Sequence, residues 1–187
     1  MLKPFYQGKL DTFCAIYAVL NALQITHSIR VLKARDILNE TLLELAGDPA
    51  AFRAVLTQET DYVFLVDGML HTLARAYPLE VIRPCAAGDS LDRVWDVLRD
   101  WLTGAPNRAA IFRFLRHYSP EGPAKNRHWT VADRLDGNTV HLFDCSHEAE
   151  AILNLPKDAC VTRPDEVSGG KLLVVQPETL RLVRLYL

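Results

Sequence analysis

The sequence predicts an α+β fold in which a helical N-terminal half packs on an antiparallel β-sheet formed by the C-terminal half. Apolar residues recur at helical spacing up to about residue 102, and short strand-like runs follow from residue 108 onwards. Because helices and strands fall in separate blocks, α+β is favoured over an alternating α/β arrangement. The 187 residues contain no repeat, low-complexity tract or linker, so residues 1–187 are expected to form a single domain.

The helical half begins near residue 11. Asp11 or Thr12 is the expected N-cap of the first helix, because either side chain can accept a hydrogen bond from the first turn. The apolar face of this helix consists of Phe13, Ile16, Tyr17, Leu20 and Leu23. Further helices are expected at residues 31–46, 51–58, 68–76 and 91–102.

The C-terminal half has the period of β-strands. Strands are expected at residues 108–115, 128–135 and 139–144. The last two flank Asp136-Gly137-Asn138, which is a strong hairpin signal. Residues 172–176 and 180–187 are expected to form a second hairpin, closed by Pro177-Glu178.

Charge and hydropathy exclude several classes of partner. The formal net charge is −2, and the tightest basic group, Arg30, Lys33 and Arg35, lacks interleaved aromatic residues, which argues against a nucleic-acid partner. No apolar run reaches the roughly 18 residues of a membrane helix, and the N-terminus lacks the pattern of a signal peptide. We therefore expect a cytoplasmic protein that binds neither membranes nor nucleic acid.

The chain has four cysteines: Cys14, Cys85, Cys145 and Cys160. They form no C-x-x-C pair, and Cys145-x-His147 fits no common zinc pattern, so we expect free thiols and neither a metal nor a cofactor. A single cysteine is most often a small buried hydrophobe. Only Cys14 has neighbours that argue for chemistry, whereas Cys145 follows Asp144 and is expected to point to the opposite face of the strand.

Three polar residues on different elements can form a nucleophilic site. Cys14 lies in the predicted first turn of a helix, where unpaired N–H groups and the helix dipole stabilise a thiolate. His128 begins a predicted strand beside a loop, and Asp144 ends the next strand of the same hairpin. The tight turn brings His128 and Asp144 close to cross-strand positions. Together they can supply a nucleophile, its base and the group that orients the base.

A fourth candidate precedes the first helix. Gln7 can direct its side-chain amide at an oxyanion, with the backbone N–H of Cys14 as the second donor. Each candidate taken alone is more often a core, strand-end, capping or surface residue. Their order and element types together favour a catalytic site. The loop at residues 118–127 delivers the chain to His128 and is expected to form one mobile wall of the substrate cleft.

The order of these residues resembles that of the papain-like cysteine peptidase superfamily, and most closely that of small C39-like peptidases and Josephin-type deubiquitinases. The resemblance covers residues 5–25, with Cys14, Ala18 and Asn21 on one helix face, and residues 126–146; it does not extend to residues 30–115. It implies a papain-like fold with the nucleophile on a central helix. The site residues that it implies are Gln7, Cys14, His128 and Asp144.

The expected function is hydrolysis of a peptide or isopeptide bond in a peptide or protein substrate, through a thioester on Cys14. The same thioester serves acyl transfer to an amine, and the sequence does not separate these two reactions. A non-catalytic papain-like domain that binds peptides is an alternative from a different class. A cytosolic zinc protein that uses Cys145, His147 and Cys160 is a third alternative.

Overall fold

The computed structural model describes residues 2–8, 11–124, 126–146 and 152–186. Within these ranges the chain forms five α-helices and an eight-stranded sheet, so the predicted α+β class is confirmed. The helices are α1 (Cys14–His27), α2 (Val31–Ala46), α3 (Pro49–Leu56), α4 (Val63–Leu73) and α5 (Leu91–Gly104). None of these described helices is long and apolar enough to cross a membrane.

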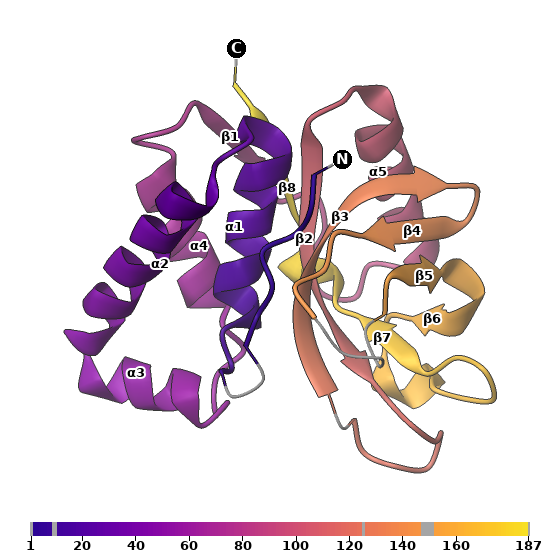
Figure 1. Cartoon of the computed structure of the whole chain (residues 1–187). Helices are drawn as coiled ribbons and strands as arrows, with labels where there is room; N and C mark the ends of the chain where they lie inside the picture. Colours follow the sequence, from indigo (N-terminus) through magenta and orange to yellow (C-terminus); the bar gives the residue numbers. More distant parts are fainter. Residues whose placement is uncertain (1, 9–10, 125, 147–151, 187) are drawn as a thin grey trace.

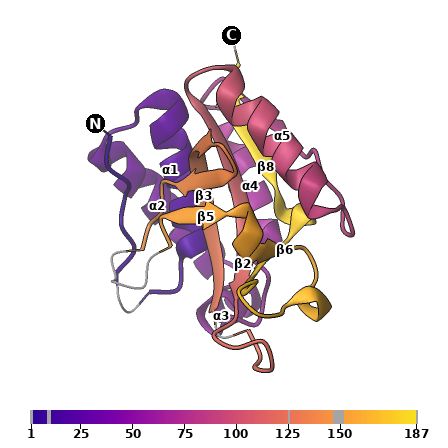
Figure 2. The same ribbon diagram turned by 90° about the vertical axis from the view of Figure 1, so that its right-hand side faces the viewer.

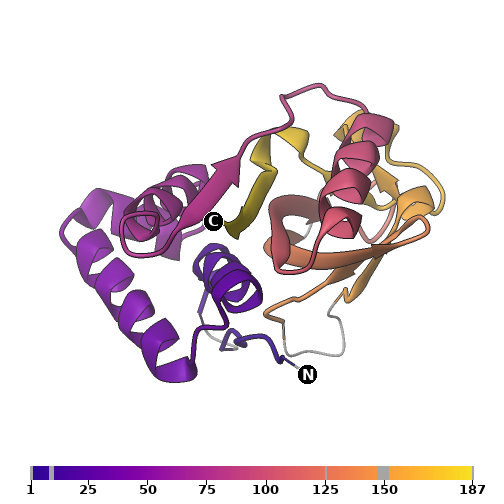
Figure 3. The ribbon, with the colours of Figure 1, turned by 90° about the horizontal axis from the view of Figure 1, so that it is seen from above.

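The sheet follows the order β1-β8-β2-β3-β4-β5, and β7 pairs with both β2 and β6. All pairings are antiparallel except that between β6 and β7. The strands are β1 (Leu79–Ile82), β2 (Arg108–Arg116), β3 (Asn126–Asp136), β4 (Thr139–Leu142), β5 (Asn154–Pro156), β6 (Cys160–Val161), β7 (Leu173–Val175) and β8 (Arg181–Leu185). Helices α1–α4 lie on one side of the sheet and α5 lies on the other (Figures 1 and 3).

Helix α1 is buried on almost its whole surface. Twelve of its 14 residues are buried, and these include the polar residues Asn21, Gln24 and Thr26. A helix that is apolar nearly all round belongs inside a domain, and α1 lies between the other N-terminal helices and the sheet (Figure 1). It begins at Cys14, after the expected cap residues, because the Asp11 carboxylate accepts the N–H of Phe13 at 3.2 Å and so closes the turn before the helix.

The central strand β2 is covered on both faces. Ala109 and Ile111 belong to the core cluster around α1, whereas Ala110, Phe112 and Phe114 belong to the cluster beneath α5. This alternation is the two-residue period of a strand. Figure 2 shows α5 lying across the second face, where the buried Trp95 and Leu98 pack. The sheet therefore holds two core clusters apart, one on each face.

The helix predictions differ from the structure by a few residues at the starts and the ends of several helices. Helix α2 has the expected bounds, but α3 begins at Pro49 and α4 at Val63. Asp48 explains the early start of α3, because its carboxylate accepts the N–H groups of Ala50 and Ala51, both at 3.1 Å. Asp48 is thus the N-cap of α3, and Pro49 lies in its first turn. The same two residues follow the end of α2 at Ala46.

The first predicted hairpin is confirmed. Asp136 pairs with Thr139 across a two-residue turn, and Gly137 has a φ of 56°, a left-handed conformation that glycine adopts without strain. A register shift between Ala132 and Arg134 interrupts the β3–β4 ladder nearer the site.

The second predicted hairpin is wrong. Strands β7 and β8 do not pair with each other; they follow one another along β2, which is long enough to pair with both. A 3-10 turn, Pro177–Thr179, separates them. The Thr179 hydroxyl accepts the Arg113 N–H at 2.9 Å and donates to the Gln176 carbonyl at 2.7 Å, and so replaces ladder bonds at the break. The short strands β1, β5 and β6 were not predicted, because two to four residues carry too little periodicity.

A buried arginine joins the helical half to the sheet. Arg181 on β8 has a side chain only 4% exposed, and its Nε and Nη2 donate to the two oxygens of Asp67 on α4 at 2.7 and 3.1 Å. Its Nη1 donates to the carbonyls of Glu178 and Leu180. Asp67 also contacts Arg83 at 3.0 Å, but the Arg83 side chain is 62% exposed.

We expect Asp67→Ala to lower the free energy of unfolding by about 3 kcal/mol, because it leaves the buried Arg181 guanidinium without a counter-charge. The matched control is Arg83→Ala, which removes an exposed partner of the same carboxylate and is expected to cost less than about 1 kcal/mol. Urea denaturation of the three proteins measures both values. Equal losses in the two variants would contradict this account of Arg181.

Candidate active site

Three of the four predicted site residues line one small hollow of about 100 Å³. Its lining residues are Gln7, Asp11, Thr12, Cys14, Gln58, Thr60, Tyr62, Asn126, Arg127 and His128. Cys14 is the first residue of α1 and is 7% exposed. The structure therefore brings Gln7, Cys14 and His128 together at the point where α1 begins and β3 approaches it.

The fourth predicted residue lies behind the histidine. Asp144 Oδ1 is 2.7 Å from His128 Nε2, so the predicted contact between the two side chains is present. The Thr130 hydroxyl donates to the same oxygen at 2.6 Å, and the Ser146 N–H donates to Oδ2 at 3.2 Å. The other ring nitrogen, Nδ1, lies on the side of the ring away from Asp144 and takes no part in this contact. The edge of the ring packs against Phe114 with 5.6 Å between centroids.

The register of the hairpin explains how Asp144 reaches the ring. The Phe143 N–H donates to the Val131 carbonyl at 2.8 Å, which places Asp144 beside Thr130. Since Thr130 and His128 are two residues apart on β3, their side chains share a face. Thr130 was not predicted as a site residue, although this two-residue spacing from His128 was a signal for it.

Burial and hydrogen bonding act in opposite directions on the pair. Burial disfavours a charged ring, but hydrogen bonding with Asp144, Cys14 and Cys145 outweighs it and raises the pKa of His128 well above its usual 6.5. Burial also opposes a charged carboxylate at Asp144, but the bonds from His128, Thr130 and Ser146 lower its pKa to about 2. Both shifts favour an imidazolium–carboxylate pair near neutral pH.

Cys145 is beside the ring, contrary to the prediction that it points away from the site. Its sulfur donates to Gln7 Oε1 at 3.6 Å, and a ligand atom of each of His128, Asp144 and Cys145 lies within 4.8 Å of the others. The prediction failed because β4 ends at Leu142, so strand alternation no longer governs the side chains that follow. Burial raises the pKa of the Cys145 thiol to about 11, although His128 acts in the opposite direction.

Gln7 is held at both ends of its side chain and by its backbone. Its N–H donates to the Cys145 carbonyl at 2.9 Å, and its Nε2 donates to the Asp11 carbonyl. Asn21 on α1 holds the same segment, because its side chain accepts the Phe5 N–H at 2.7 Å and donates to the Phe5 carbonyl at 3.2 Å. The bond to Asp11 uses one of the two N–H groups of the Gln7 amide.

The walls of the hollow differ in part from those predicted. Of the expected wall at residues 118–127, Asn126 and Arg127 line the hollow, and residue 125 lies outside the described residues. A second wall comes from the segment at residues 58–62, of which Gln58, Thr60 and Tyr62 line the hollow; the sequence did not indicate this segment. The Asp61 carbonyl of that segment accepts the Trp129 Nε1–H at 2.8 Å. Trp129 follows His128 on β3, so its side chain lies on the opposite face of the strand, where it is buried in the core cluster around α1.

The zinc alternative based on Cys145, His147 and Cys160 is not supported by the positions of the two cysteines. Cys145 belongs to the core cluster around α1, whereas Cys160 belongs to the cluster beneath α5, and its sulfur donates to the Pro156 carbonyl at 3.3 Å. Burial raises the pKa of the Cys160 thiol to about 12. His147 lies outside the described residues.

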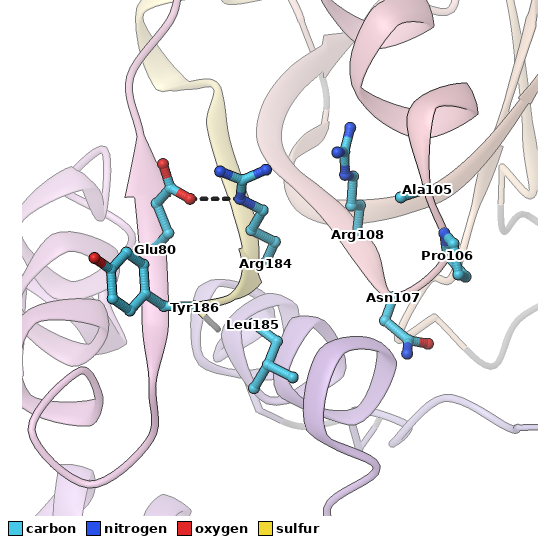
Figure 4. Close-up of a pocket in the computed structure, with 8 residues that line it drawn as sticks. All are labelled: Glu80, Ala105, Pro106, Asn107, Arg108, Arg184, Leu185 and Tyr186. Atoms are coloured by element: carbon cyan, nitrogen blue, oxygen red, sulfur yellow. Dashed lines mark hydrogen bonds and ion pairs between the residues drawn. The ribbon is translucent and has the colours of Figure 1, made fainter.

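A larger hollow of about 480 Å³ lies at the opposite end of β2 (Figure 4). Its lining residues are Glu80, Ala105, Pro106, Asn107, Arg108, Arg184, Leu185 and Tyr186. Arg184 pairs with Glu80, and Arg108 and Arg184 lie over the Trp101 ring at 4.7 and 5.5 Å. Because none of its lining residues is a cysteine or histidine, this hollow has no group suited to thiol chemistry.

The smaller hollow combines a thiol at a helix start, an imidazole with one nitrogen free of its carboxylate, and a nearby side-chain amide. These groups can form and resolve an acyl-thioester. Comparison of the chain with protein-family models, with curated proteins and with solved structures gave no match.

The pKa shifts predict how the contribution of the His128–Asp144 pair to the free energy of unfolding changes with pH. The lowered pKa of Asp144 contributes stability above about pH 4 that is lost as the pH falls through about 2. The raised pKa of His128 contributes stability that is complete below about pH 6.5 and is lost as the pH rises through its folded value. We expect Asp144→Ala to cost the most, about 2 kcal/mol or more, between about pH 4 and 6.5.

The measurement is the free energy of urea unfolding of the native protein and of Asp144→Ala from pH 2 to pH 10. The difference between the two proteins should shrink on both sides of that window. A difference that stays constant with pH would show that the carboxylate acts only through packing.

Proposed function

We propose that the protein is a papain-like cysteine hydrolase that cleaves peptide or isopeptide bonds in peptide or protein substrates. The observation that carries this proposal is the buried 2.7 Å contact between His128 and Asp144, made beside the hollow that His128 shares with Cys14 at the start of α1. The nearly fully buried α1, packed against the sheet that carries the histidine, also supports a papain-like architecture.

In the proposed reaction, the Cys14 sulfur attacks the substrate carbonyl carbon while His128 Nδ1 carries the proton that the thiol has lost. The raised pKa of His128 favours this imidazolium form, which balances the negative charge on sulfur. The imidazolium then gives its proton to the leaving nitrogen as the C–N bond breaks. Water, deprotonated by His128, attacks the thioester and releases Cys14.

Two donors are available for the oxyanion. The first N–H groups of a helix lack intrahelical acceptors, so the Cys14 N–H can point at the developing charge. The second donor is the Gln7 amide, whose Nε2 keeps one N–H beyond the bond to the Asp11 carbonyl. Gln7 lines the same hollow as Cys14, which supports this assignment.

We expect Cys14→Ala to abolish peptide cleavage while leaving the domain folded, at a cost of about 1 kcal/mol for the small loss of packing. The test is digestion of a diverse synthetic peptide mixture, read by mass spectrometry, with native protein and variant compared. Products that carry an added amine would indicate acyl transfer, and cleavage that persists in Cys14→Ala would exclude Cys14 as the nucleophile. If the native thiol shows no enhanced reaction with iodoacetamide near pH 6, the non-catalytic alternative is favoured.

The role of Asp144 can be measured without a substrate. We expect Asp144→Ala to move the acid limb of the Cys14 alkylation rate to higher pH, because His128 loses the group that favours its charged form. Asp144→Asn is the milder control, since an amide oxygen still accepts from the ring and from Thr130. If Asp144→Ala and the native protein give superimposable rate profiles, Asp144 has no part in activating Cys14, and the proposed site consists of Cys14 and His128 alone.

A further inference from the structure

Three possible metal ligands meet beside the proposed nucleophile. A ligand atom from each of His128, Asp144 and Cys145 lies within 4.8 Å of the other two, and the residues are 9%, 2% and 1% exposed. An imidazole nitrogen, a carboxylate oxygen and a thiolate sulfur are the ligand types that zinc takes in proteins. Across residues 2–8, 11–124, 126–146 and 152–186, no other cluster of His, Cys, Asp and Glu is arranged in this way.

We propose that His128, Asp144 and Cys145 form a binding site for Zn²⁺ that competes with the pairing of His128 and Asp144. This goes beyond the proposed function, because metal binding requires no catalysis. When the metal binds, the Cys145 thiol and the His128 imidazolium each lose one proton to solvent, so that the sulfur binds as a thiolate and the ring binds in its neutral form. One carboxylate and one thiolate then balance the two charges of the ion, so the buried site carries no net charge.

The nitrogen–oxygen pair of the site needs only a small adjustment. Zinc–nitrogen and zinc–oxygen bonds of about 2.0–2.1 Å place neighbouring ligands of a tetrahedral site roughly 3.3 Å apart. His128 Nε2 and Asp144 Oδ1 are now 2.7 Å apart, so they must separate by roughly 0.6 Å. The Thr130 hydroxyl, which donates to Oδ1, would continue to orient the carboxylate.

The surroundings provide a fourth position and a route of entry. The Ser146 hydroxyl is 3.4 Å from His128 Nε2, and Gln7 Oε1 is 3.6 Å from the Cys145 sulfur, so a water in the fourth position would have polar neighbours. The hollow beside Cys14 reaches both Gln7 and His128. Displacement of the Gln7 side chain from Cys145 would open the cluster to that hollow.

Cys14 is not a ligand in the proposed site. The site therefore differs from one in which zinc is bound by the nucleophilic thiol and its histidine base. His128 Nε2 faces Asp144, whereas the opposite ring nitrogen remains for Cys14, and one tetrahedral ion cannot use both nitrogens of the ring. Zinc would therefore remove the proton acceptor from Cys14 without contacting its sulfur. Occupancy of the site would leave Cys14 unactivated.

The test is titration of the reduced protein with Zn²⁺ against a chromophoric chelator, without substrate. We expect one zinc per native chain, affinity lowered more than about 100-fold in Cys145→Ser, and affinity within about threefold of native in Cys14→Ser and in the control Cys85→Ser. With Co²⁺ as the probe, a thiolate-to-cobalt absorption band should persist in Cys14→Ser. This second readout does not depend on whether Cys145→Ser folds.

Loss of zinc binding in Cys14→Ser with retention in Cys145→Ser would overturn the proposal, and so would the absence of micromolar binding by the native chain. Neither result bears on hydrolysis, because no substrate is present. Conversely, a chain that binds zinc as expected but cleaves no peptide would contradict only the hydrolase proposal.

Discussion

The buried contact between His128 and Asp144 is the constraint on which the site depends. A carboxylate that is 2% exposed loses several kcal/mol of hydration, so it is tolerated only when its oxygens are satisfied. Three donors satisfy it: the His128 ring, the Thr130 hydroxyl and the Ser146 N–H. Two of these are on β3, so the β3–β4 register must be correct for the charge to be buried at all. The turn at Gly137 and the register shift beyond Ala132 therefore set the chemistry as well as the fold.

The other half of the site depends on the placement of α1. Because this helix is buried nearly all round in the core between the other N-terminal helices and the sheet, its position is fixed, and its first residue, Cys14, has little freedom to move away from β3. The segment that precedes α1 and carries Gln7 is fastened by Asn21 on α1 and by the backbone of Cys145, which follows β4. The hollow is thus assembled from the ends of rigid elements, which suits a site that must hold several groups in register.

The sequence was sufficient for features that depend on local patterns and insufficient where tertiary packing decides. Helix α2, the hairpin at Gly137 and the contact of His128 with Asp144 follow from periodicity and turn chemistry. The position of Cys145 does not, because strand alternation was extended past the end of β4. The wall at residues 58–62 was missed for a similar reason: it is held by a carbonyl at Asp61 that bonds Trp129, and backbone acceptors leave no trace in a sequence.

The two thiols beside His128 have the same chemistry, and both are buried, but they lie in different surroundings. Cys14 opens a helix and faces the hollow, whereas Cys145 is 1% exposed, and burial raises its pKa to about 11. Cys145 therefore keeps its proton at neutral pH and can donate it to Gln7 Oε1. That bond decides which end of the Gln7 amide is the acceptor, so Nε2 must lie on the other side, where it reaches the Asp11 carbonyl. In the proposed mechanism, the protonated thiol thus sets the orientation of the oxyanion donor, while His128 activates the other thiol.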